Sequence, residues 1–251
     1  MYIKTDGIVL REVAYQDSDK LLTVLTREYG KLTVRARGVR SSRSRSKAAC
    51  QLLAYSEFTL LERGGRYVVT EATAKEMFPE LRNDLELLSL ASYFAQAADV
   101  LSPEGVENPP FVSLLLNALY ALGRLGLPQK LVKAAFELRV MAESGYAPDL
   151  TSCGVCGEVI ENPPVCFSVR AGTAADAKGA GRVGGYAQLV DSTLRAMLHA
   201  LTAEPNKVYA FALSGPAREQ FCAMAEEYVK YHLGRGFESL QFYRSLQVPL
   251  K

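Results

Sequence analysis

The apolar residues of this chain change their spacing at Phe78-Pro79. Before this point they fall in short runs rich in Val, Ile, Leu and Thr, which is typical of β-strands. After it they recur every three or four residues, which is typical of α-helices. The 251 residues are enough for one large domain or two smaller ones. We therefore predict a multidomain α+β protein, with one domain in residues 1–79 and a second in residues 80–251.

The first domain contains five predicted strands: Ile3–Ala14, Lys20–Glu28, Lys31–Val39, Ala54–Glu62 and Arg66–Thr73. Tyr29-Gly30 and Arg63-Gly64-Gly65 are turn signals that join neighbouring strands. The longest irregular stretch, residues 40–51, lies between the third and fourth strands. Five strands with a long third connection are typical of the OB-fold, a small barrel that often binds oligonucleotides. A five-stranded barrel without any ligand is the alternative.

The second domain is predicted to be α-helical, with one irregular insertion. Helical spacing covers residues 85–101, 114–125 and 131–141, and it resumes at 189–203 and 217–233. The tail, residues 237–246, is expected to pack back on the body. Residues 151–187 follow neither period and contain Cys153-Gly-Val-Cys156, Pro163-Pro164 and a Gly/Ala-rich stretch. We predict this segment to be an irregular, cysteine-containing insertion in the helical domain.

A dense basic run begins in the third predicted strand and continues into the loop that follows. It contains seven cations and no acidic residue, although the whole chain has a formal net charge of only +2. Positive charge that is concentrated in one segment favours binding to a specific anionic partner over nonspecific binding by the whole protein. The candidate DNA-binding residues are Lys31, Arg35, Arg37, Arg40, Arg43, Arg45 and Lys47.

The strand half of this run has two faces, because side chains alternate along a strand. Leu32, Val34 and Ala36 are expected to enter the barrel core, whereas Lys31, Thr33, Arg35 and Arg37 face outward. The Arg-Ser half, Arg40–Lys47, is expected to be mobile and to become ordered on DNA. Five rings in the same domain are candidate stacking platforms for bases: Tyr15, Tyr29, Tyr55, Phe58 and Tyr67. The alternative role is a solvated edge that prevents aggregation of the sheet.

The cysteines offer half of a metal site. Cys153-x-x-Cys156 matches one knuckle of a zinc ribbon, but a closed structural site needs four ligands. Only Cys166 is nearby, on a different spacing, and Asp176 is an isolated oxygen donor. We therefore expect no cofactor, with a structural zinc at Cys153 and Cys156 as the alternative. Gly179-Ala-Gly181-Arg-Val-Gly184 matches a nucleotide-binding pattern by letter, but no strand is predicted before it.

The remaining signals favour a protein that is not an enzyme and that works in the cytoplasm. The chain has two histidines and lacks the HExxH, GxSxG and P-loop motifs. Its five cysteines are an odd number, and we expect neither a signal peptide nor a membrane-spanning segment. Reduced thiols in a reducing compartment are the simplest interpretation.

Three groups of motifs carry a family resemblance. The N-terminal group is Thr5–Arg11, Asp17–Thr26 and Tyr29–Arg40. The middle group is Phe136–Arg139, Gly145–Leu150 and Cys153–Gly157, and Tyr231-His-Leu-Gly follows near the C-terminus. In this order, and across the whole chain, they resemble the bacterial recombination mediator family RecO.

This resemblance implies an OB-fold followed by a helical domain with a zinc-ribbon-like insertion at residues 151–187. It implies DNA repair and homologous recombination through the RecF pathway, in the cytoplasm and at the nucleoid during repair. Such proteins bind single- and double-stranded DNA and anneal complementary strands. With RecR they help load RecA onto DNA coated by single-strand-binding protein (SSB), whose C-terminal tail they also bind.

The sequence departs from the family pattern at the second cysteine pair, and two other classes of function are also considered. Zinc-binding family members carry a second CxxC, and the matching positions here fall near Ala175 and Lys178, so the insertion is degenerate. The alternative function is a protein-only adaptor whose basic run binds acidic tails. A zinc-dependent enzyme is a third class.

Overall fold

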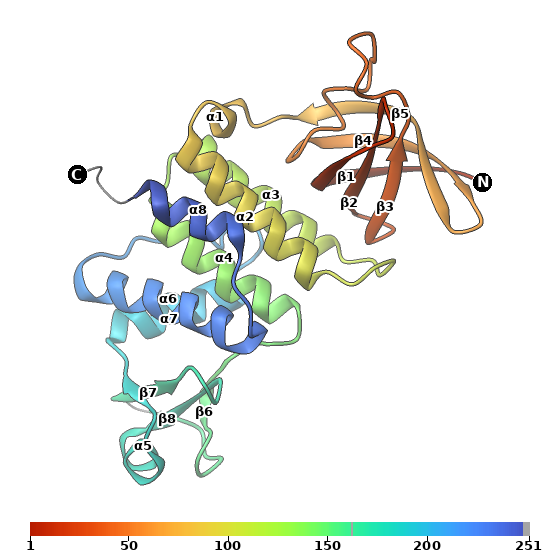
Figure 1. Cartoon of the computed structure of the whole chain (residues 1–251). Helices are drawn as coiled ribbons and strands as arrows, with labels where there is room; N and C mark the ends of the chain where they lie inside the picture. Colours follow the sequence, from red (N-terminus) through yellow and green to blue (C-terminus); the bar gives the residue numbers. More distant parts are fainter. Residues whose placement is uncertain (162, 248–251) are drawn as a thin grey trace. The chain divides into compact units, whose positions relative to one another are not determined.

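The structure, a computed structural model, describes residues 1–161 and 163–247, which form two compact units (Figure 1). The first unit contains Met1–Leu125 together with the C-terminal segment that begins at Phe237. The second contains Gly126–Gly236. Within the described ranges, no helix combines the length and the apolarity needed to cross a membrane.

The first unit begins with a closed five-stranded barrel, as predicted. Its strands are β1 (Tyr2–Tyr15), β2 (Asp19–Thr26), β3 (Lys31–Ala36), β4 (Tyr55–Arg63) and β5 (Arg66–Glu76). The order around the barrel is β1-β2-β3-β5-β4, and β4 pairs with β1 to close it. β3 and β5 run parallel, and the other pairs are antiparallel. This is the strand arrangement of an OB-fold, coloured red to orange in Figure 1.

Alternating burial along the strands fills this barrel. In β3 the side chains of Leu32, Val34 and Ala36 are buried, as predicted, and those between them are partly or fully exposed. Val24, Phe58 and Leu60 meet them in one apolar cluster. Because side chains alternate along a strand, the polar and charged residues of β3 face outward.

Four helices complete the first unit: α1 (Pro79–Arg82), α2 (Leu85–Leu101), α3 (Pro109–Gly123) and α8 (Glu238–Leu246). The Asp84 side chain caps α2 by accepting hydrogen bonds from two backbone amides. Two prolines stand in the first turn of α3, where no intrahelical N–H is needed. The predicted tail packs on the body: α8 contacts α2, and Ser239 Oγ donates to Gln96 Oε1 at 2.6 Å.

The second unit is built on three long helices, α4 (Gln129–Glu143), α6 (Asp191–Thr202) and α7 (Gly215–Leu233), which pack against one another. The predicted apolar face of α7 is confirmed, because Phe221, Met224, Ala225 and Tyr228 are all buried. The division into two units places α1–α3 and α8 with the barrel, so the first unit continues past residue 79. Residue 79, where we expect a domain boundary, lies shortly after the end of β5 at Glu76.

Residues 151–187, which we expected to be irregular, contain turns and loops together with short regular elements that the sequence did not reveal. Part of this segment forms a four-stranded sheet with the order β6-β8-β7-β9, built from β6 (Asp149–Cys153), β7 (Val165–Ser168), β8 (Thr173–Asp176) and β9 (Ala187–Gln188). A short helix, α5 (Ala177–Val183), follows β8 directly. These strands have two to five residues each, so none is long enough to show a period in the sequence.

The glycine pattern in this segment therefore does follow a strand, contrary to our expectation. β8 ends at Asp176, and Gly179 and Gly181 lie inside α5, with Gly184 at its C-terminal end. The dinucleotide fingerprint needs its first glycine in the turn between strand and helix. The position of these glycines does not match that geometry.

Candidate nucleic-acid interface

A β-bulge in β1 determines which side chains face outward next to the basic run. Val9 pairs with Val24 of β2, but Arg11 pairs with Thr23, so Leu10 is an extra residue that is buried. A bulge of this kind re-aims the residues that follow it. Beyond it, Arg11, Val13 and Tyr15 project outward, and Val13 and Tyr15 are 49% and 38% exposed.

The strand register aligns these residues with β2 and β3 in successive rows. One row is Arg11, Thr23 and Thr33, the next is Val13, Leu21 and Arg35, and the last begins with Tyr15 and Asp19. Side chains of directly paired residues lie on the same side of a sheet, and Arg11 Nη2 accordingly donates to Thr23 Oγ1 at 3.3 Å. We call this surface of β1, β2 and β3 the outer face.

The seven predicted cations do not share one environment, and Lys31 is the most enclosed of them. Its Nζ lies 3.3 Å from a carboxylate oxygen of Asp99 in α2 and 2.5 Å from the Asp99 carbonyl oxygen. Only 12% of its side chain is exposed. Beside it, Gly30 adopts a positive φ and abuts the Val106 backbone, where a Cβ would lie 2.2 Å from the carbonyl oxygen. Lys31 thus ties the barrel to the helices of its own unit.

Arg35 is also neutralised, by a buried acid on the neighbouring strand. Its Nε and Nη2 lie 2.7 and 2.6 Å from Oδ2 of Asp19, and it also donates to the Gln16 side chain. The other oxygen of Asp19 accepts from the backbone N–H of Gly38 at 2.8 Å. The Gly38 amide and then Arg35 lower the pKa of Asp19 below its ordinary value, because both stabilise the charged carboxylate. Asp19 therefore fixes the point where β3 passes into the basic loop.

The other five predicted cations are exposed on the loop that follows β3: Arg37, Arg40, Arg43, Arg45 and Lys47. We call residues 37–47 the basic loop. Within the described part of the chain, none of the five forms an ion pair with an acidic residue. Arg40 donates instead to backbone carbonyls of the β1–β2 turn, at 3.2 Å for Asp17 and 3.4 Å for Gln16. The basic loop therefore carries five positive charges that no side chain in residues 1–161 or 163–247 neutralises.

The basic loop is a chain of tight turns that is anchored at both ends. Backbone hydrogen bonds join Ser41 to Gly38, Ser44 to Ser41 and Lys47 to Ser44. Ser46 Oγ accepts from the backbone N–H of Ala72 in β5 at 3.2 Å. Cys50 is fully buried just beyond, and burial raises the pKa of its thiol to about 12. Both ends of the basic loop are thus attached to the barrel, while its cations point to solvent.

Of the five candidate stacking rings, the structure leaves one open on the outer face. Phe58 is fully buried, and Tyr29 and Tyr67 pack against the barrel core. Tyr55 is partly buried, and its hydroxyl is hydrogen-bonded. Tyr15 is exposed, with the Arg35 guanidinium 5.1 Å from its ring centroid.

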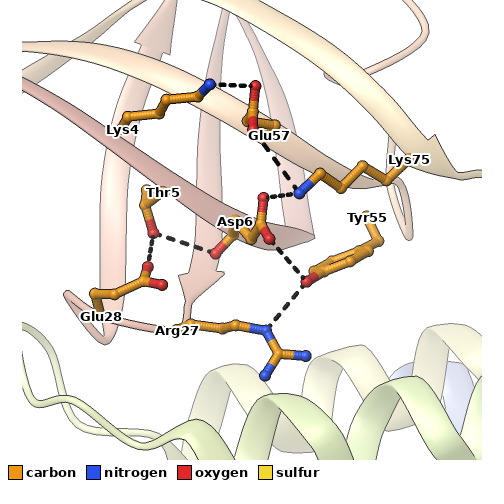
Figure 2. A network of polar contacts seen from close by, with 8 residues as sticks. All are labelled: Lys4, Thr5, Asp6, Arg27, Glu28, Tyr55, Glu57 and Lys75. Atoms are coloured by element: carbon orange, nitrogen blue, oxygen red, sulfur yellow. Dashed lines mark hydrogen bonds and ion pairs between the residues drawn. The ribbon is translucent and has the colours of Figure 1, made fainter.

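Another part of the barrel surface carries cations and acids in a balanced arrangement (Figure 2). Lys75 contacts Asp6 and lies 3.9 Å from Glu57, and Lys4 lies 2.9 Å from the same Glu57 carboxylate. Arg27 Nε donates to the Tyr55 hydroxyl at 3.1 Å. We call this set the neutral network; its members are Lys4, Thr5, Asp6, Arg27, Glu28, Tyr55, Glu57 and Lys75. Three cations face three acids, so the network has little charge to offer a polyanion.

The cysteines of the described insertion do not gather the four ligands that a closed zinc site needs. Cys153 Sγ lies 3.8 Å from Oδ1 of Asp176, but this oxygen already caps α5 by accepting from Gly179 N at 2.6 Å. A Cβ on Gly179 would come within 2.9 Å of the Cys153 sulfur, so α5 fills the space beside this thiol. Among the described residues, no group of three or more His, Cys, Asp or Glu side chains is placed to hold a metal ion.

Three residues of this interface were not predicted from the sequence: Arg11, Asp19 and Asp99. Asp19 and Asp99 lie 16 and 68 residues from the cations that they neutralise. Arg11 reaches the outer face only because of the bulge at Leu10. The signal available for Asp19 was its place in the Asp17–Thr26 motif, where it is the first residue of β2.

Comparisons with known proteins agree with this architecture. Residues 1–78 match the family "Recombination protein O N terminal", and residues 82–241 match "Recombination protein O C terminal". The DNA repair protein RecO of Acetivibrio thermocellus is 28% identical over 98% of this chain and 97% of the relative. That of Desulforamulus reducens is 30% identical over 95% and 93%, and that of Desulforudis audaxviator is 42% identical over 61% of each. The chain therefore belongs to the RecO family of DNA repair and recombination proteins.

Proposed function

We propose that this protein is a recombination mediator that binds single- and double-stranded DNA and anneals complementary strands. The observation that carries the proposal is the basic loop, whose five exposed cations have no acidic partner in the described chain. It adjoins the outer face of β1, β2 and β3, and strands 2 and 3 of an OB-fold commonly contact oligonucleotides.

Annealing follows from neutralisation of charge. Like charges held in one loop repel one another, and a phosphate backbone relieves this repulsion while counterions are released from the nucleic acid. Arginine suits this role because its planar guanidinium donates two parallel hydrogen bonds to a phosphate. Two DNA strands repel one another less once the protein screens their phosphates. The protein therefore promotes annealing through binding alone, without catalysis and without a cofactor.

The proposed partners follow from membership of the RecO family. With RecR, the protein helps load RecA onto DNA coated by SSB, within the RecF pathway. The acidic, Phe-ended C-terminal tail of SSB binds to the helical domain. The work takes place in the cytoplasm, at the nucleoid during repair.

One experiment separates this function from a protein-only adaptor whose basic loop binds acidic tails. The full chain is titrated into a fluorescently labelled 20-nucleotide oligo-dT and, separately, into a labelled acidic peptide. We expect binding to the oligonucleotide and faster annealing of two complementary strands. Binding to the acidic peptide without binding to naked oligonucleotide would support the adaptor and contradict the proposal.

A further inference from the structure

Two large rings are exposed on the described part of the barrel, one before and one after the bulge in β1. Tyr2 is 65% exposed and pairs with Leu61 of β4, before the bulge in β1. Tyr15 is 38% exposed and pairs with Asp19 of β2, after the bulge. Tyr15 is thus the ring that the outer face presents beside the basic loop.

The surroundings of Tyr15 hold its ring in place. The Arg35 guanidinium lies 5.1 Å from the ring centroid, and Asp19 in turn fixes Arg35 through two short contacts. Gln16, the next residue, accepts a hydrogen bond from Arg35 as well. A ring that is already held loses little conformational freedom when a ligand stacks on it. More than a third of its surface nevertheless stays open to solvent.

We propose that Tyr15 stacks against one base of bound single-stranded DNA, while the cations of the basic loop hold the neighbouring phosphates. This inference rests on the proposed function and names the residue of that site that contacts a base. Stacking on aromatic rings, helped by arginine, is how proteins bind single strands without reading their sequence. Arg40 reaches the turn directly after Tyr15, so a phosphate site lies next to the ring.

The proposed DNA-binding surface offers one open ring and five cations, and this combination suits strand annealing. A surface that stacks every base hides the edges that must pair with a second strand. This face stacks one base and holds the backbone by its charges. The other bases remain free to pair, which suits a protein that brings complementary strands together.

The test separates base stacking from phosphate binding. It measures the affinity of the protein for two probes of equal length, a 20-nucleotide oligo-dT and a 20-unit oligonucleotide of abasic sites. Both carry phosphates, but only the first has bases. The variants of the full chain are Tyr15→Ala and Tyr15→Phe, with Tyr2→Ala as the matched removal of an exposed ring elsewhere on the barrel. Circular dichroism checks that each variant is folded.

We expect Tyr15→Ala to weaken binding to oligo-dT by about 5- to 150-fold, the range for loss of one stacked base. Binding of this variant to the abasic probe is expected to match that of the unmodified protein. Tyr15→Phe and Tyr2→Ala should both leave oligo-dT binding unchanged. An equal loss on both probes would overturn the inference, because Tyr15 would then act by positioning Arg35 on phosphate. Unchanged binding of Tyr15→Ala to oligo-dT would also overturn it. If the unmodified protein binds neither probe, the proposed function itself fails.

Discussion

The basic loop and the neutral network lie on the same small barrel and differ in what balances their charge. In the neutral network, Lys4 and Lys75 face Asp6 and Glu57, so each of these two lysines has an acid within a few ångströms. In the basic loop, five cations follow one another and no described acid pairs with them. A count of cations along the sequence therefore does not locate a binding site. The acids that reach them in the fold decide which cations are free for a ligand.

Arg35 lies between these two cases and shows how the division arises. It belongs to the basic run in sequence, but Asp19 neutralises it across the sheet. Lys31 behaves in the same way with Asp99. Both paired cations point from β3, and the five free ones come after it. The positive charge that we propose to bind DNA thus begins where the strand ends.

The largest effect should come from reversing the charge of the basic loop. We expect the triple variant Arg37→Glu, Arg43→Glu and Arg45→Glu to bind oligo-dT at least about a hundredfold more weakly at 0.1 M salt. Loss of three phosphate contacts removes roughly 2.1 from the log–log salt slope. Strand annealing, followed by fluorescence quenching of a labelled pair, should be abolished. An unchanged annealing rate in a variant with a normal circular dichroism spectrum would place the DNA site elsewhere.

A smaller effect is expected when a paired cation is turned into a free one. Asp19→Asn keeps an oxygen for the Gly38 amide but removes the negative charge that neutralises Arg35. Arg35 should then act as an additional phosphate contact, with about fivefold tighter binding at 0.1 M salt and a slope steeper by roughly 0.7. A salt series on oligo-dT measures both values. Weaker binding would show that Asp19 contributes more by shaping the basic loop than by neutralising Arg35.

The smallest effect is a local dependence on pH at the same residue. The pKa of Asp19 is lowered by the Gly38 amide and Arg35, so its contribution to stability is complete above its unfolded pKa. That contribution is lost as the pH falls through the lower, folded pKa. The amide resonance of Gly38 should therefore titrate below the ordinary aspartate value of about 3.9. A midpoint at or above this value would contradict the arrangement.

The barrel and the long helices were predictable because each is built from a repeated period. β3 alternates over six residues and α2 keeps its helical spacing over 17, which is long enough for the period to appear. The sheet formed by β6, β7, β8 and β9 was missed because its strands have at most five residues. Its pairing depends on contacts between distant segments, which a local period does not encode.

The candidate site was predictable in its composition and only partly in its arrangement. The sequence indicates a run of cations with an inward and an outward face, and the inward face of β3 is confirmed. The acids that neutralise Lys31 and Arg35 come from other elements, so their effect depends on the tertiary fold. The bulge at Leu10, which turns Tyr15 outward, is likewise a property of strand pairing.

The most direct test of the account removes two positive charges from either surface and compares the salt dependence of oligo-dT binding. Arg43→Gln with Arg45→Gln changes the basic loop, and Lys4→Gln with Lys75→Gln changes the neutral network, so both variants have the same net charge. Five phosphate contacts predict a log–log slope of about −3.5 for the unmodified protein and about −2.1 for the loop variant. The network variant should keep a slope of about −3.5. Equal slopes for the two variants, or a slope near zero for the unmodified protein, would contradict the claim that the free cations of the basic loop form the DNA-binding surface.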